Sequence, residues 1–296
     1  MQLLNTADTY IDNELVKQLP GFTSHYLLVN DVQLHYVLGG QGKPLVLLPG
    51  WPQTWWSYHK IMPLLAESYQ VIVVELRGMG GSDKPMAGYS KKGMAGDVSA
   101  LLDQLGIERT LIAGHDIGAA VAFSFAAHFP QKTEKLVLLD TPHPDENLYS
   151  LPILPTGGGV HPWWVAFNQV KALPEQLLEG RFHLVQNWLF DQLLEDKTAI
   201  NSFDRHVYAQ AYNHQDAIRA SNGWYQTFPE DIVDIKGKRI EAPAIGIAGP
   251  AGYQMLSYAL PPYIDKLELK VVVGAGHFVQ EERPLETVRF IQDFLG

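Results

Sequence analysis

Residues 114–119, Gly-His-Asp-Ile-Gly-Ala, constrain the fold more than any other stretch of the chain. An apolar run at 110–113 precedes them and reads as a buried strand, while the helix formers at 120–127 follow and end before Pro130. Small residues at three positions allow a strand-to-helix turn that is too tight for larger side chains. Such a turn exposes Asp116 and directs the N–H groups of the new helix toward it. This is the geometry of a nucleophile elbow, with Asp in the place of Ser. The alternative is a strand that ends in an N-capping Asp.

The rest of the chain alternates short apolar runs with helical patterns, which predicts an α/β fold with a mostly parallel sheet and right-handed crossovers. We expect a hairpin at 25–38 and helices at 93–105 and 284–295. The expected strands after the hairpin are 45–48, 71–74, 110–113, 136–139, 244–248 and 267–273. Between Thr141 and Phe228 the strand-like runs vanish, and aromatic-rich helical patterns follow an opening rich in Pro and Gly at 152–159. We therefore expect a sheet core formed by residues 1–140 and 229–296, with a helical cap inserted at 141–228.

Composition excludes several classes of protein. The 46% hydrophobic content of the 296 residues is enough for a sizeable core. The formal net charge of −10 argues against nucleic acid or an anionic membrane surface as a partner. The absence of cysteine excludes disulfides and Cys-ligated metals. The start of the chain lacks the pattern of a secretion signal, and no run approaches the length of about 18 apolar residues that a membrane span requires. We therefore expect a cytoplasmic protein.

Three chemistry-bearing residues, Asp116, Asp140 and His277, follow expected strands at their carboxyl ends. Ligands of open parallel sheets bind beyond these ends. Each residue alone has an ordinary reading as an N-cap, a loop carboxylate or a surface histidine. Their order of nucleophile, acid and base matches the Ser, Asp/Glu, His order of α/β-hydrolases, with Asp as the first member. The glycine-rich loop 78–81 lacks both nucleotide-binding patterns, so we expect a close backbone turn there and no nucleotide.

Motifs over nearly the whole chain resemble the epoxide hydrolase and dehalogenase branch of the α/β-hydrolases. They are Pro49-Gly50-Trp51-Pro52, Gly80-Gly81-Ser82-Asp83-Lys84-Pro85 and the elbow at 114–119. The resemblance implies an α/β-hydrolase fold with a cap, and oxyanion donors at the backbone N–H groups of Trp51 and Ile117. Pro49 departs from the family, which usually has His there. Asp140 is also early for the acid, a placement similar to that of some bacterial epoxide hydrolases and of fluoroacetate dehalogenases.

A carboxylate nucleophile has a physical advantage at an alkyl carbon. Its attack leaves an ester, whose carbonyl accepts hydroxide, whereas Ser would leave an ether that water does not readily cleave. Asp is already ionised, with an ordinary pKa of about 3.9, so the attack needs no base. His277, oriented by Asp140, is then expected to activate the water that hydrolyses the Asp116 ester.

The expected cap offers donors for the oxygen of an opening epoxide. Epoxide hydrolases generally use two cap tyrosines, or a histidine and a tyrosine, and by spacing these fall on Trp164 and Tyr225. An indole N–H can donate a hydrogen bond but cannot release a proton at neutral pH, so Tyr225 is expected to be the acid, supported by Trp163 or Trp164. The alternative for the Trp pair is core packing, and His161 is a weaker candidate.

The substrate class follows from the aromatic residues. A pocket lined by Trp51, Trp163, Trp164, Trp224 and Phe167 favours a small apolar or aromatic epoxide, with water as the second reactant. A dehalogenase is the alternative. Ile117 stands where haloalkane dehalogenases usually have Trp, and Ile117 and Ala120 stand where fluoroacetate dehalogenases have Arg. A non-catalytic ligand-binding protein on the same scaffold is the third reading. We expect no cofactor and no metal, and a homodimer stays open.

Overall fold

The structure is a computed structural model that describes residues 12–151 and 161–296. In these residues a sheet of eight strands forms in the order β1-β2-β4-β3-β5-β6-β7-β8. The strands are β1 (Phe22–Val29), β2 (Val32–Gly39), β3 (Lys43–Leu48), β4 (Tyr69–Val74), β5 (Thr110–His115), β6 (Thr133–Leu139), β7 (Ala244–Ala248) and β8 (Leu267–Val271). The pairs β1–β2 and β2–β4 are antiparallel, and the other five are parallel. The prediction of an α/β fold with a mostly parallel sheet is therefore confirmed.

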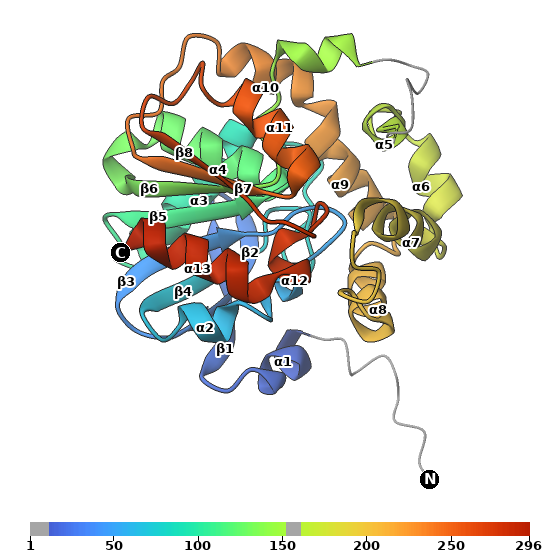
Figure 1. Cartoon of the computed structure of the whole chain (residues 1–296). Helices are drawn as coiled ribbons and strands as arrows, with labels where there is room; N and C mark the ends of the chain where they lie inside the picture. The colour runs from blue at the N-terminus through green and yellow to red at the C-terminus, as the bar shows by residue number, and fades with distance from the viewer. Residues whose placement is uncertain (1–11, 152–160) are drawn as a thin grey trace.

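The short apolar strands alternate between two hydrophobic layers. In β3, Val46 and Leu48 face one cluster of buried side chains, while Leu45 and Leu47 face the other. All four are fully buried, because helices cover both faces of the sheet (Figure 1). A strand buried on both faces needs apolar residues at successive positions. This explains why these strands read as continuous apolar runs in the sequence.

Helices of the core pack on both sides of this sheet. On one side α3 (Lys91–Gln104) contacts α4 (Ile117–His128), and on the other α13 (Pro284–Leu295) contacts α2 (Met62–Leu65). The Ser90 side chain accepts the backbone N–H of Gly93, which fixes the start of α3 two residues before the expected position. The remaining core helices are α1 (Asp12–Leu15), α11 (Pro250–Ala259) and α12 (Val279–Glu282), with 3-10 turns η2 (Val16–Gln18), η3 (Trp55–Tyr58) and η4 (Pro130–Lys132).

Helices fill the segment between β6 and β7 as far as the structure describes it. They are η5 (Glu146–Ser150), α5 (Trp163–Phe167), α6 (Leu173–Leu178), α7 (Phe182–Leu193), α8 (Ser202–Ala211), α9 (Gln215–Gln226) and α10 (Phe228–Asp234). Figure 1 shows α5 to α8 to one side of the sheet. We call residues 141–228 the cap, and these bounds stay a prediction. The Pro- and Gly-rich opening at 152–159 and the start of the chain at 1–11 lie outside the described residues.

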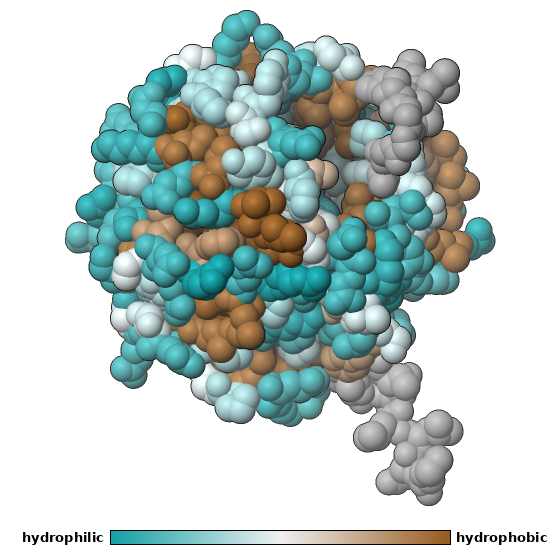
Figure 2. Space-filling model, in the orientation of Figure 1, coloured by the Kyte–Doolittle hydropathy of each residue, from teal (hydrophilic) through white to brown (hydrophobic). Residues whose placement is uncertain are grey.

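The surface is hydrophilic over most of the face drawn in Figure 2, with separate apolar patches. One patch lies over α6, where Leu173 and Leu177 are exposed. Among the described residues, none of the helices has the length and apolar character that a membrane crossing demands.

Candidate active site

Asp116 stands at the turn between β5 and α4 in a backbone conformation that non-glycine residues rarely adopt. Its φ is 51° and its ψ is −121°. Close backbone packing enforces the turn: a Cβ on Gly118 would lie 2.0 Å from the Leu48 carbonyl oxygen, and one on Gly50 would lie 2.4 Å from Cβ of Asp116. Strain of this kind persists only where the surrounding structure imposes it. The small residues therefore let the chain present the Asp116 carboxylate at the end of the strand.

The Asp116 carboxylate faces backbone donors. Its Oδ1 accepts the N–H of Trp51 at 2.9 Å, and the N–H of Ile117 also hydrogen-bonds with the carboxylate. Its side chain accepts none of the N-capping hydrogen bonds, which come from the second or third residue of a helix. Burial raises the pKa of Asp116, while the charge of His277 and these two N–H groups oppose the rise. The N–H groups of Trp51 and Ile117, the two predicted oxyanion donors, thus both contact this carboxylate.

His277 lies between two carboxylates. Its Nδ1–H donates to Oδ2 of Asp140 at 2.7 Å, and its Nε2 lies 3.7 Å from Oδ2 of Asp116. Burial by itself lowers the pKa of His277, but the hydrogen bond and charge of Asp140 and the charge of Asp116 outweigh it and raise the pKa above 6.5. The backbone of His277 is fixed as well, because its carbonyl oxygen accepts Nε2–H of His115 at 2.9 Å.

Asp140 reaches His277 through space that a glycine leaves open. It has a φ of 59°, and its Oδ1 accepts the N–H of Gly249 at 3.0 Å. A Cβ on Gly252 would lie 2.1 Å from that same oxygen. Burial raises the pKa of Asp140 to about 6, although the hydrogen bond with His277 opposes this rise. No sequence pattern pointed to Gly252, because its role depends only on its contact with Asp140.

Tyr225, on α9, is buried in the cap and reaches the same cavity. Its ring meets Trp51 edge-to-face at 5.6 Å between centroids, and its hydroxyl interacts with the side chain of Asn168. Burial and then the charge of Asp116 raise the pKa of Tyr225 well above its usual value, so that the hydroxyl keeps its proton. Asn168 is 2% exposed, and its amide nitrogen has no other hydrogen-bond partner among the described residues. No sequence pattern pointed to Asn168.

A cavity of about 720 Å³ joins these groups. It falls within the range of about 300–1,000 Å³ that is usual for small-molecule sites. Apolar residues from the core and the cap form most of its wall, among them Ile117, Ala120, Leu148, Trp164, Val165, Leu189, Phe228 and Met255. Among the described lining residues there is no lysine or arginine, so the wall offers no permanent positive charge to a substrate carboxylate.

Part of the predicted aromatic lining is wrong. Among the described lining residues, Trp51 and Trp164 are on the wall, but Trp163, Trp224 and Phe167 are not. Trp163 packs behind Trp164, against Phe167 at 5.7 Å and Trp188 at 5.4 Å between ring centroids. Trp224 is fully buried, and its indole N–H donates to the Arg77 carbonyl at 3.0 Å. Neighbouring positions on a helix face different directions, and periodicity alone did not fix which indole faces the cavity. His161 is also not among the described lining residues.

The loop that carries Trp51 is supported despite Pro49 in the place of the family histidine. The Gln53 side chain donates to Oε1 of Glu281 at 3.0 Å, and the Gln53 carbonyl accepts the hydroxyl of Tyr212 at 2.7 Å. Both partners are buried, and Tyr212 belongs to the cap. The oxyanion loop is thus held from the core and from the cap at once.

Two other clusters bring imidazole and carboxylate atoms within 4.8 Å of one another among the described residues: Asp12 with His35 and Glu75, and His59 with Asp204 and Glu281. In the first, Glu75 accepts the backbone N–H groups of Trp55 at 3.2 Å and Gly81 at 2.7 Å. In the second, Asp204 accepts the indole N–H of Trp56 at 2.8 Å. These bonds explain the buried carboxylates as parts of structural networks. The first also explains the glycine-rich loop 78–81, which folds around Glu75.

This chain is similar in sequence and fold to several known proteins. The family model described as the alpha/beta hydrolase fold matches residues 43–284. The soluble epoxide hydrolase of Corynebacterium sp. (strain C12) is 32% identical over 88% of this chain and 93% of its own length. The fluoroacetate dehalogenase of Burkholderia sp. is 28% identical over 93% of this chain and 94% of its own length. The solved structure of the epoxide hydrolase CorEH without ligand has a TM-score of 0.81 and 29% identity, over 93% of this chain and 98% of that one.

Proposed function

Because this chain belongs to the α/β-hydrolase fold family, in the branch of epoxide hydrolases and dehalogenases, and is a hydrolase, we propose that it opens an apolar or aromatic epoxide to a vicinal diol. The observation that carries the proposal is the arrangement around Asp116 in a mostly apolar cavity. One carboxylate oxygen is held by the Trp51 N–H at 2.9 Å, and the other lies 3.7 Å from Nε2 of His277. We assign a covalent two-step hydrolysis to Asp116, Asp140 and His277 at the end of the sheet and to Tyr225 in the cap.

The first step forms an ester. Oδ2 of Asp116 attacks an epoxide carbon, because Oδ1 already accepts the Trp51 N–H. The new C–O bond forms as the ring C–O bond breaks, and the released oxygen takes the proton of the Tyr225 hydroxyl. The interaction with Asn168 favours the phenolate that remains, since it lowers the pKa of Tyr225 against the effect of burial. Trp164 on the cavity wall supplies apolar contact, and its indole N–H is a second donor for the epoxide oxygen.

The second step hydrolyses the ester. Nε2 of His277 takes a proton from water, and the hydroxide attacks Cγ of Asp116. Negative charge develops on Oδ1, where the Trp51 and Ile117 N–H groups stabilise it. The bond between Cγ and Oδ2 then breaks, the departing oxygen takes the remaining proton of the attacking water, and the diol leaves. The imidazolium proton passes to the Tyr225 phenolate through solvent, so that both residues regain their starting states. Asp140 stabilises the imidazolium through the 2.7 Å hydrogen bond.

A dehalogenase that uses the same Asp116 is the second candidate, and the similarity to the fluoroacetate dehalogenase favours it. The absence of lysine and arginine among the described lining residues argues against a haloacid substrate. A neutral haloalkane is compatible with the apolar wall, and a halide would accept the indole N–H of Trp164.

A side-by-side substrate panel decides between these reactions. Styrene-oxide-like epoxides and short haloalkanes are offered to the wild type and to the Asp116→Asn variant, with diol and halide measured in the same samples. We expect diol formation by the wild type alone. Halide release without diol would make the protein a dehalogenase. Binding of these compounds without either product would favour the non-catalytic reading.

A further inference from the structure

A buried carboxylate, that of Glu282 at the end of α12, holds the backbone on both sides of His277. Glu282 is 4% exposed. Its Oε1 accepts the N–H of Gly276 at 2.9 Å and the N–H of Phe278 at 3.2 Å. The segment 272–278, which carries His277, has no helix or strand of its own. Its position therefore depends on such individual hydrogen bonds.

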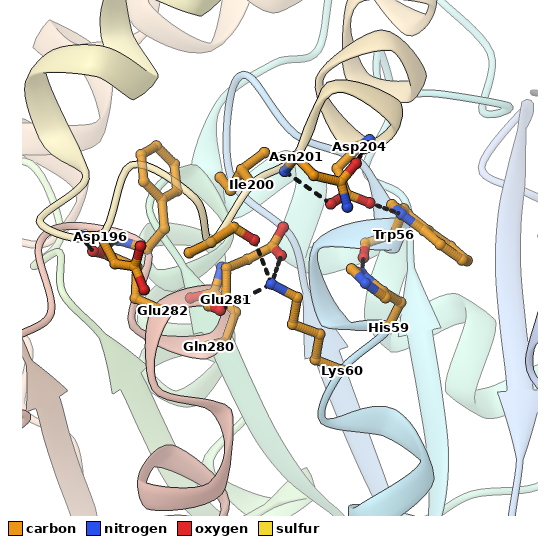
Figure 3. A network of polar contacts seen from close by, with 12 residues as sticks. Trp56, His59, Lys60, Asp196, Ile200, Asn201, Asp204, Gln280, Glu281 and Glu282 are labelled. Carbon is orange, nitrogen blue, oxygen red and sulfur yellow. Dashed lines mark hydrogen bonds and ion pairs between the residues drawn. The ribbon is translucent and has the colours of Figure 1, made fainter.

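The other oxygen of Glu282 faces the cap. Oε2 accepts the N–H of Glu195 at 2.7 Å and the N–H of Asp196 at 2.9 Å, in the connection between α7 and α8. Figure 3 shows Glu282 beside Asp196, whereas the adjacent Glu281 lies beside Lys60. One carboxylate thus accepts four backbone N–H groups from two segments about 80 residues apart in the chain. Hydrogen bonds to a charged acceptor are about twice as strong as neutral ones.

The two segments also meet directly through their backbones. The His277 N–H donates to the Leu193 carbonyl at 2.9 Å. A Cβ on Gly276 would lie 2.1 Å from that same carbonyl oxygen and 2.9 Å from the Glu195 nitrogen. Leu193 and Glu195 both line the cavity. The loop that carries His277 and this wall of the cavity are therefore in direct contact, and Glu282 hydrogen-bonds to both. We call this contact, between residues 276–278 and 193–196, the seam.

We propose that Glu282 is a positioning residue. It fixes His277 between Asp140 and Asp116, and it holds the cap segment 193–196 against the loop 276–278 that carries His277. This inference rests on the proposed role of His277 as the base of the second step. The 3.7 Å separation between Nε2 and the Asp116 carboxylate leaves little tolerance, because a displacement of about 1 Å can cost about a hundredfold in rate.

Other contacts dock this part of the cap independently of Glu282. The Lys60 ammonium donates to the carbonyls of Glu281, at 3.0 Å, and of Ala199, and Arg283 lies 3.6 Å from a carboxylate oxygen of Asp196. Figure 3 draws the Lys60 contact next to Glu281. We therefore expect the loss of the Glu282 charge to loosen the seam and leave the cap in place.

The test is the near-isosteric variant Glu282→Gln. Its amide offers one acceptor oxygen and one NH2 donor, so two of the four backbone N–H groups lose their acceptor. Glu286→Gln is the matched control, because Glu286 lies on α13, has a side chain 34% exposed and pairs with Arg289. In hydrogen exchange without substrate, we expect the amides of 195–196 and 276–278 to exchange about tenfold faster in Glu282→Gln and unchanged in the control.

Single-turnover kinetics with styrene oxide separate the two steps. We expect ester formation within about threefold of the wild type and ester hydrolysis about 10- to 100-fold slower.

The pH dependence of hydrolysis gives a second readout. The groups that face His277 are the carboxylates of Asp140, Asp116 and Glu282 and the ring of His115; burial holds the pKa of His115 well below 6.5. Loss of one negative charge lowers the pKa of His277, so the midpoint of the hydrolysis profile moves to lower pH. Glu282→Asp keeps the charge and restores that midpoint.

The same variant can overturn the proposal. The proposal fails if Glu282→Gln hydrolyses the ester and exchanges its amides at the rates of Glu286→Gln. It also fails if Glu282→Gln slows ester formation and ester hydrolysis equally, with a lower Tm and an unmoved pH midpoint. If the wild type forms no ester with any epoxide, the proposed function fails instead. Amide exchange and an NMR titration of the His277 imidazole, neither of which needs a substrate, then decide whether Glu282 positions it.

Discussion

A methyl group added at position 252 should disable the second step of the reaction and spare the first. Gly252 lies in the first turn of α11, against the carboxylate of Asp140. In Gly252→Ala the new Cβ would lie 2.1 Å from Oδ1, 2.5 Å from Cγ and 2.9 Å from Oδ2 of Asp140, whereas ordinary contacts begin near 3.4 Å. One of the two must move by more than 1 Å.

The carboxylate is the part that moves. The backbone at 252 is fixed by the helix and by Gly249 before it, whereas Asp140 is held by one bond to the Gly249 N–H and one to His277. A shift of about 1 Å breaks the 2.7 Å bond that orients the imidazole. Misplacement of this size corresponds to about a hundredfold loss in rate. We therefore expect ester hydrolysis about 100-fold slower and ester formation within about threefold of the wild type, since Asp116, Trp51 and Tyr225 are untouched.

The assay is rapid quenching after mixing with styrene oxide, followed by mass measurement of the peptide that contains Asp116. Gly252→Ala should accumulate the ester, which the wild type consumes. Gly96→Ala is the control, because a Cβ there meets open space in the middle of α3. A double-mutant cycle with Asp140→Ala tests the route of the effect: the two changes together should cost no more than Asp140→Ala alone. Additive losses, or equal slowing of both steps, would refute the reasoning.

Further predictions concern the acid, the base and the wall of the cavity. Tyr225→Phe should slow epoxide opening about 100-fold and leave ester hydrolysis within a few-fold, measured by the same quenched reactions. The rate of the hydrolysis step should rise with pH, because His277 works as a base only when neutral; the hydrogen bond and charge of Asp140, which persist in the ester, raise the pKa that sets the midpoint. Asp140→Asn should move that midpoint to lower pH, since the charge and hydrogen bond that raise the pKa are weakened; an unmoved midpoint would contradict the pairing. Trp164→Leu should raise KM for aryl epoxides several-fold more than Trp163→Leu, because Trp164 is on the cavity wall and Trp163 is behind it; equal effects would contradict this placement.

Local chemistry made much of the fold predictable. The apolar runs of β3, β5 and β6 are buried on both faces and so read as strands, and the small residues around Asp116 permit the tight turn between strand and helix. The structure brings Asp116, Asp140 and His277 together because all three follow strands whose carboxyl ends meet at one edge of the sheet. Such features depend on residues close together in the sequence, or on the general rule for parallel sheets.

Side-chain direction in the cap and support from distant segments were not predictable in the same way. Trp163, Trp164 and Trp224 have the same chemistry, and only tertiary packing decides which indole meets the cavity. Gly252 matters because of what Asp140 does more than a hundred residues earlier. Asn168, Gln53 and Glu282 act through partners far away in the chain, and no periodicity or motif records such a contact.

The most direct measurement of the central proposal is a single turnover of an epoxide in water enriched in oxygen-18, with enzyme in excess. Hydrolysis of the ester at Cγ of Asp116 places one heavy oxygen in the carboxylate, so the peptide that contains residue 116 should gain mass and the diol of that first turnover should contain none. A diol that carries the heavy oxygen, with an unlabelled Asp116 peptide, would mean that water attacks the epoxide directly and that Asp116 is not the nucleophile.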